Sequence, residues 1–144
     1  MQILVLHGPN LNLLGTREPQ VYGSTTLEQI NTGLADYAAA RGASLSAFQS
    51  NHEGARVDRV HAARTDGTAF IIINPGALTH SSWALRDALD AFDGFAIEVH
   101  ISNPAAREPF RHVSTVAGVV DGSIAGFGAF GYELAAYSVL RHLS

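Results

Sequence analysis

Three short apolar stretches, each followed directly by polar residues, constrain the fold of this chain most strongly. Residues 3–6, 70–73 and 95–99 are rich in β-branched and aromatic residues, and segments with helical periodicity separate them. Such stretches are typical of buried strands in a parallel sheet. Ligands of these sheets bind beyond the carboxyl ends of the strands. The polar residues that follow, among them Asn10, Asn74 and His100, are therefore expected at one site.

The whole chain divides into five strand–helix units. We expect strands over residues 2–6, 43–49, 68–73, 95–99 and 122–127. The first helix should begin at Thr25, with Glu28 at capping-box spacing, and end near Gly42. A second helix should turn Val57, Val60 and Ala63 inward, and Ser81 or Ser82 should cap a third helix that carries Trp83, Ala84, Ala88 and Phe92. A closing helix is expected over residues 132–142. Pro104 and Pro109 interrupt residues 104–120, whose last part fits a strand or a loop.

Alternation of strands and helices with short connections predicts right-handed crossovers and a doubly wound α/β sandwich of three layers. The natural strand order for five such units is 2-1-3-4-5. The loops after the first and third strands would then be neighbours, with the end of the fourth strand beside them. A length of 144 residues fits a single domain, residues 1–144.

Composition excludes several classes of chemistry. The chain has no Cys, so it has no disulfide, no thiolate nucleophile and no thiolate metal site. All nine basic residues are Arg, so no lysine can form an imine with a carbonyl substrate. A net charge of -4 without like-charge blocks argues against nucleic acid as a partner, and no stretch is suited to a signal peptide or a membrane span. We expect a cytoplasmic protein, and no metal, because the seven histidines lack ligand spacing.

An acid–base pair can be assembled from two parts of the chain. Lowering the pKa of a tyrosine from 10 to 7 requires about 4 kcal/mol, and a guanidinium at about 4 Å contributes roughly that at an effective dielectric near 20. Arg17 could thus make Tyr22 a base; the alternative is that Tyr22 anchors a loop while Arg17 pairs with Glu18. His100 fits a general acid, since Glu98 points to the same side of the strand; the alternative is an ordinary satisfied histidine.

Other polar residues near the same edge fit a ligand with several hydroxyl groups. Asn10, Asn74, His80 and Ser102 are hydrogen-bonding residues close to strand ends. Arg107 and Arg111 lie about one helical turn apart and could bind a carboxylate, or could form a solvated face. The glycines of residues 126–131 only partly match a dinucleotide fingerprint, and they more simply allow close strand-to-helix packing.

Taken together, these residues resemble the type II 3-dehydroquinases, also called 3-dehydroquinate dehydratases. The matching segments occur in order and run nearly from end to end: GPNL at 8–11, LGTREP at 14–19, VYG at 21–23, QSNHEG at 49–54, NPGALTHSS at 74–82, ALRDA at 84–88, EVHISN at 98–103, and GFG at 126–128 with GY at 131–132.

The resemblance implies a flavodoxin-like fold and a cofactor-free anti elimination of water from 3-dehydroquinate, which gives 3-dehydroshikimate in the shikimate pathway or in quinate breakdown. It implies Tyr22 as the base with Arg17 favouring its phenolate, Asn10 holding a water on the enolate, and His100, oriented by Glu98, as the acid. Substrate carboxylate would bind at Ile101 and Ser102, and ring hydroxyls at Asn74, His80 and Arg111. The implied assembly is a homododecamer of four trimers, in which Asp87 reaches a neighbouring site.

Departures from the family pattern cluster near Arg111. The family usually has Glu, His and Tyr where this chain has Pro109, Val113 and Thr115. Pro109 removes a backbone donor just before Arg111, so we expect the position of Arg111 to be where this chain differs most from the family. The alternative is a flavodoxin-like module that binds a flavin or a nucleotide, because one fold hosts many functions. The first loop argues against it, since Pro9, Asn10, Arg17 and Tyr22 do not form a phosphate cradle.

Residues 10–24 form a long loop that we expect to act as a lid.

Overall fold

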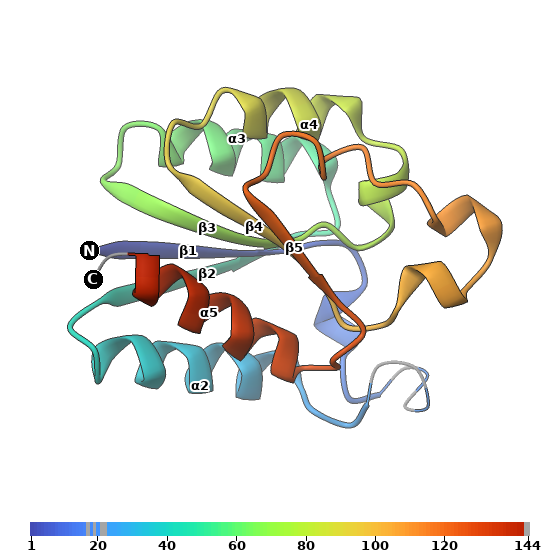
Figure 1. Ribbon diagram of the computed structural model, residues 1–144, viewed down its shortest axis with the longest axis horizontal. Coiled ribbons are helices and arrows are strands. Elements are labelled where there is room, and N and C mark those ends of the chain that lie inside the picture. Colours follow the sequence, from blue (N-terminus) through green and yellow to red (C-terminus); the bar gives the residue numbers. More distant parts are fainter. Residues whose placement is uncertain (17, 19, 21–22, 143–144) are drawn as a thin grey trace.

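A five-stranded parallel sheet with helices on both faces forms the protein (Figure 1). The computed structural model describes residues 1–16, 18, 20 and 23–142. Its strands run in the order β2-β1-β3-β4-β5, and every adjacent pair is parallel. The predicted order is therefore confirmed. The strands are β1 (Gln2–His7), β2 (Ser44–Gln49), β3 (Thr68–Asn74), β4 (Phe95–His100) and β5 (Gly122–Ala125).

Two pairs of helices complete the three layers. The helices α2 (Leu27–Ala39) and α5 (Phe130–His142) cover one face, and α3 (Glu53–Ala63) and α4 (Trp83–Asp90) cover the other (Figure 1). Each pair packs over its own apolar cluster, so the core is divided by the sheet. The structure thus confirms the predicted three-layer α/β sandwich.

The two central strands alternate their side chains between these clusters. Ile3 and Val5 of β1 pack on the α2–α5 side, whereas Leu4 and Leu6 pack on the α3–α4 side. All four are fully buried. Because burying such a side chain contributes about 1.5–3 kcal/mol, β1 and β3 make a rigid frame that fixes where their carboxyl ends lie.

The first helix starts later than expected. Its N-cap is Thr26, whose side chain accepts a hydrogen bond from the Gln29 amide, while the Gln29 side chain accepts from the Thr26 amide. The prediction of Thr25 with Glu28 was therefore wrong by one residue. Both pairs have capping-box spacing, so the sequence pattern alone does not distinguish them.

Several other boundaries also differ from the prediction. Ser82 caps α4 as expected, but Trp83 is 67% exposed and the buried Phe92 lies beyond the last helical residue. The fifth strand ends at Ala125 rather than at residue 127. Residues 104–120 contain two short 3-10 helices, η3 (Pro104–Ala106) and η4 (Pro109–Arg111), and no strand. No described helix is both long and apolar enough to cross a membrane.

Candidate active site

A polar cavity of about 210 Å³ lies at the carboxyl ends of β1, β3 and β4. The chain segments that follow these three strands supply most of its wall, and the segment of η3 and η4 closes one side. It brings together eight of the residues singled out from the sequence as candidates for the site. The lining residues are Pro9, Asn10, Leu11, Asn74, Gly76, Ala77, His80, His100, Ile101, Ser102, Pro104, Arg107 and Arg111.

The loop after β1 is held against the loop after β3 at the cavity floor. The Gly8 amide donates to the Asn74 carbonyl at 2.7 Å. A Cβ atom on Gly8 would lie 2.3 Å from the Pro75 carbonyl oxygen, so only glycine permits this approach. Asn10 follows in the left-handed region with φ 68°, and its backbone N–H donates to Asn51 Oδ1 at 3.0 Å. The backbone at Asn10 is therefore fixed on the cavity wall in a conformation that asparagine tolerates better than most residues.

His100 and Glu98 form a hydrogen-bonded pair at the end of β4. His100 Nε2 lies 2.6 Å from Glu98 Oε2, and the two side chains are 13% and 2% exposed. Because residues two apart on a strand point to the same face, the strand itself sets this contact. The carboxylate accepts, so Nε2 carries a hydrogen and Nδ1 is the imidazole nitrogen left for a ligand. His100 lines the cavity, and Glu98 stands behind it.

Two hydroxyl groups that the sequence analysis did not single out hold Glu98 in place. Thr79 Oγ1 donates to Glu98 Oε2, and Ser114 Oγ lies 3.0 and 2.9 Å from the two carboxylate oxygens. Burial by itself would raise the pKa of Glu98. The hydrogen bonds from His100, Thr79 and Ser114, together with the charge of His100, outweigh burial and hold this pKa below its usual range. Glu98 is therefore ionised at neutral pH and able to stabilise a charged imidazole.

His80 reaches the cavity with a defined tautomer. Its Nδ1 lies 2.7 Å from the Val113 carbonyl oxygen, which can only accept a hydrogen bond. Nδ1 therefore carries a hydrogen, and in the neutral ring Nε2 is left as an acceptor. The hydrogen bond to His80 comes from the backbone of Val113, whose side chain is exposed. Valine in place of the family's usual histidine therefore leaves this hydrogen bond in place.

Two arginines form the rim on the η3–η4 side. Glu108 lies between them, with its Oε1 3.0 Å from Arg111 Nε and 3.8 Å from Arg107 Nε. Arg107 also donates to Ser102 Oγ at 3.2 Å. Pro109 lies in the first turn of η4, where a backbone N–H would have no hydrogen-bond partner within the helix, so its absence costs nothing there. The proline is thus compatible with a rim position for Arg111.

The structure does not place Asp87 at this cavity, and it leaves two other predicted residues undescribed. Tyr22 and Arg17 lie outside the described residues, so their roles stay predictions. Asp87 is exposed on α4 and does not line the cavity of its own chain. Among the residues that the structure describes, no cluster of three or more His, Asp or Glu side chains is placed to hold a metal ion.

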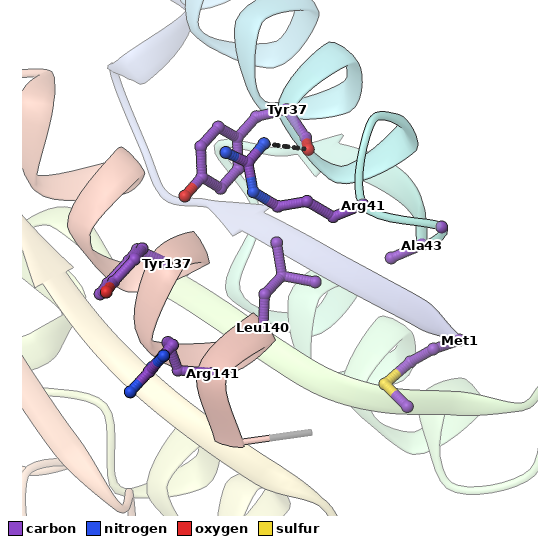
Figure 2. Close-up of a pocket in the computed structure, with 8 residues that line it drawn as sticks. Met1, Tyr37, Arg41, Ala43, Tyr137, Leu140 and Arg141 are labelled. Carbon is purple, nitrogen blue, oxygen red and sulfur yellow. Dashed lines mark hydrogen bonds between the residues drawn. The ribbon is translucent and has the colours of Figure 1, made fainter. Parts of the chain in front are cut away.

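A second, larger cavity lies at the opposite ends of the strands. It has a volume of about 570 Å³, and Figure 2 shows that side chains of α2, of the turn that follows it and of α5 surround it together with Met1. The Arg41 guanidinium stacks 3.6 Å from the centre of the Tyr37 ring and donates to the Tyr37 carbonyl. Its lining residues include neither a carboxylate nor an imidazole. The smaller cavity is therefore the candidate active site, because it alone of the two holds a paired acid–base group.

Comparison with known proteins identifies a family for this arrangement. The profile described as Dehydroquinase class II matches residues 1–140. The chain belongs to this family. It is 58% identical to the 3-dehydroquinate dehydratase of Xanthomonas oryzae pv. oryzae over 141 residues, which are 98% of this chain and 95% of that protein. It is 61% identical to the 3-dehydroquinate dehydratase of Bordetella avium over 140 residues, 97% of each chain.

Solved structures agree with this assignment. The type II dehydroquinase from Propionibacterium acnes superposes with a TM-score of 0.93 and 46% identity, over 97% of this chain and 96% of that one. The type II dehydroquinase from Butyrivibrio crossotus gives a TM-score of 0.94 and 45% identity, over 98% and 97%. The resemblance noted in the sequence is thus confirmed. The class II dehydroquinase fold extends over nearly the whole chain.

Proposed function

We propose that this chain is a 3-dehydroquinate dehydratase of type II, a hydro-lyase that removes water from 3-dehydroquinate by anti elimination and needs no cofactor. Membership of the class II dehydroquinases supports the activity. The observation that carries the proposal for the site is the His100–Glu98 pair at the wall of a small polar cavity. At about 210 Å³ the cavity is smaller than the roughly 300–1,000 Å³ typical of sites for drug-sized ligands, which fits a single polyhydroxylated ring.

In the proposed first step Tyr22 removes a proton. Its phenolate takes the proton from the carbon next to the ketone, and the electron pair moves to the carbonyl oxygen to form an enolate. Arg17 favours the phenolate by its charge. A water held by Asn10 stabilises the enolate oxygen, and the fixed backbone of Asn10 supports such a role.

In the proposed second step His100 acts as the general acid. The enolate collapses, the bond to the ring hydroxyl breaks, and His100 gives its Nδ1 proton to the leaving oxygen, which departs as water. Ionised Glu98 on Nε2 favours the charged imidazole that precedes this transfer. The product is 3-dehydroshikimate, and the proton taken by Tyr22 balances the one given by His100.

Substrate binding is assigned to the remaining polar groups of the cavity. We assign the carboxylate to Ile101 and Ser102 and the ring hydroxyls to Asn74, His80 and Arg111, all of which line the cavity. In the neutral ring Nε2 of His80 can accept a hydrogen bond from a substrate hydroxyl, whereas the Arg111 guanidinium can only donate a hydrogen bond to one. Such opposite polarities would fix the ring orientation.

We further propose that the single domain of residues 1–144 assembles as a homododecamer of four trimers, with Asp87 completing a neighbouring site. The exposure of Asp87 on α4 is compatible with such a contact. Light scattering would measure the assembly. Asp87→Ala should lower turnover, and a variant with unchanged turnover would remove Asp87 from the site. The cytoplasmic location and the lid motion of residues 10–24 stay predictions from the sequence, and both pathway roles use the same reaction.

No described feature favours the flavin or nucleotide alternative. The loop after β1 leads into η1 (Leu11–Leu13), a 3-10 helix of three residues. Phosphate cradles instead use the N-terminus of a longer helix, where several backbone N–H groups converge. Of the two functions, dehydration is therefore the one that the cavity supports.

The direct test is to add 3-dehydroquinate to the purified protein in the presence of a metal chelator. The product contains a conjugated enone, so its absorbance should rise until the substrate is consumed. A protein in its native oligomeric state that produces no enone would overturn the proposed activity.

A further inference from the structure

A buried chain of hydrogen bonds connects α2, β1 and α5 to the cavity wall. Asn31 Oδ1 lies 2.7 Å from His7 Nε2, and His7 Nδ1 lies 3.1 Å from the Tyr132 hydroxyl. That hydroxyl is 2.9 Å from Asn74 Nδ2. His7 and Tyr132 are fully buried, and Asn74 is 3% exposed while lining the cavity.

Each hydrogen of this hydrogen-bond network has only one possible position. The Gly76 amide donates to Asn74 Oδ1 at 3.1 Å, so Nδ2 is the side of the Asn74 amide that faces Tyr132 and donates to it. The Asn31 carbonyl oxygen can only accept, so His7 carries its hydrogen on Nε2 and donates it there. In the neutral ring Nδ1 is then an acceptor, so the Tyr132 hydroxyl, which also accepts from Asn74, gives its own hydrogen to Nδ1. The network is fully satisfied in one direction only.

The surroundings keep the network in this protonation state. Burial lowers the pKa of His7 to about 4, against a smaller opposing contribution from its hydrogen bond to Asn31, and burial raises the pKa of Tyr132. A neutral imidazole and a neutral phenol are the forms that this direction requires. Breaking one link would leave a buried donor or acceptor without a partner.

The consequence for the cavity concerns Asn74. With its amide orientation fixed from behind, one Nδ2 hydrogen and one Oδ1 lone pair have no partner among the described residues. We propose that Tyr132, held by His7, is a positioning residue that fixes the Asn74 amide so that it presents this donor and acceptor to a ring hydroxyl of the substrate. This proposal rests on the proposed function, in which Asn74 binds that hydroxyl.

The variant Tyr132→Phe removes the hydroxyl and keeps the ring. Asn74 binds a group present in both the ground state and the transition state, so KM should rise about tenfold, as expected for the loss of one hydrogen bond, while kcat changes less than twofold. The matched control is Tyr137→Phe on the same helix, whose ring is exposed and outside the network, and which should leave both constants unchanged.

A double-mutant cycle separates positioning from a general loss of stability. In an Asn74→Ala background, Tyr132→Phe should add no further rise in KM, because the residue through which it acts is gone. A KM within twofold of wild type for Tyr132→Phe, or an equal rise in both backgrounds, would overturn the proposal. Absence of turnover in the wild type would instead contradict the proposed function, so the two failures are distinguishable.

If Tyr132→Phe fails to fold, Asn31→Ala carries the same test from the far end. Asn31 is half-buried, and its loss frees the His7 ring while leaving every aromatic side chain in place. A twofold to fivefold rise in KM that disappears in the Asn74→Ala background would support the proposal. An unchanged KM, or a rise that persists in that background, would overturn it.

Discussion

Replacing Thr79 by valine removes one donor from the buried carboxylate of Glu98 with little change in shape. Thr79 is 1% exposed and its hydroxyl donates to Glu98 Oε2, so water cannot replace the lost bond. Hydrogen bonds to charged groups contribute about 1.5–3 kcal/mol. For a domain of 144 residues this corresponds to a melting temperature lower by about 5–10 °C.

The effect should depend on pH in a defined direction. Hydrogen bonds hold the pKa of folded Glu98 below the ordinary value of 4.5, so their stabilisation is present above pH 4.5 and is lost as the pH falls through the folded-state pKa. The difference between the variant and the wild type should therefore be full at pH 7 and should shrink as the pH falls below 4.5.

Thermal unfolding at fixed protein concentration, from pH 7 down to the lowest pH at which the wild type stays folded, measures this difference. Thr79→Ser is the matched control, because it keeps the hydroxyl and removes only a methyl group. The valine variant should be clearly less stable than the serine variant at pH 7. Equal melting temperatures for the two at pH 7, or a gap that widens in acid, would refute the role assigned to the Thr79 hydroxyl.

Two further predictions concern packing. Gly8→Ala should lower stability by about 2 kcal/mol or more, because its Cβ would meet the Pro75 carbonyl at 2.3 Å; a melting temperature equal to wild type would contradict this close approach. Arg56→Leu should raise the melting temperature by roughly 3 °C, equivalent to about 1 kcal/mol, since the guanidinium is buried and its Nε and Nη2 have no partner among the described residues. A lower melting temperature would show that its bond to the Ser50 carbonyl matters more.

The edge of the sheet where the site forms follows from the sequence by a simple rule. Parallel strands end on one side, and strand order 2-1-3-4-5 places the ends of β1, β3 and β4 next to one another. Asn10, Asn74 and His100 each follow one of these strands, so they meet at one cavity. The period of two along a strand likewise puts Glu98 beside His100.

The groups that support this site are not visible from local patterns. Ser114 contacts Glu98 from a segment that two prolines interrupt and that has no regular period. Tyr132 meets His7 across 125 residues of sequence, and only the finished packing of α5 on the sheet brings them together. The cap of α2 was misplaced by one residue because Thr25 and Thr26 each have an acceptable partner three residues on.

The central claim is that His100 gives a proton to the leaving hydroxyl, and the turnover number of His100→Ala tests it most directly. Enone formation from 3-dehydroquinate would be followed with the variant at the oligomeric state and melting temperature of the wild type. We predict that kcat falls by about 100-fold to 10,000-fold. A variant that turns over substrate at nearly the wild-type rate would contradict the account.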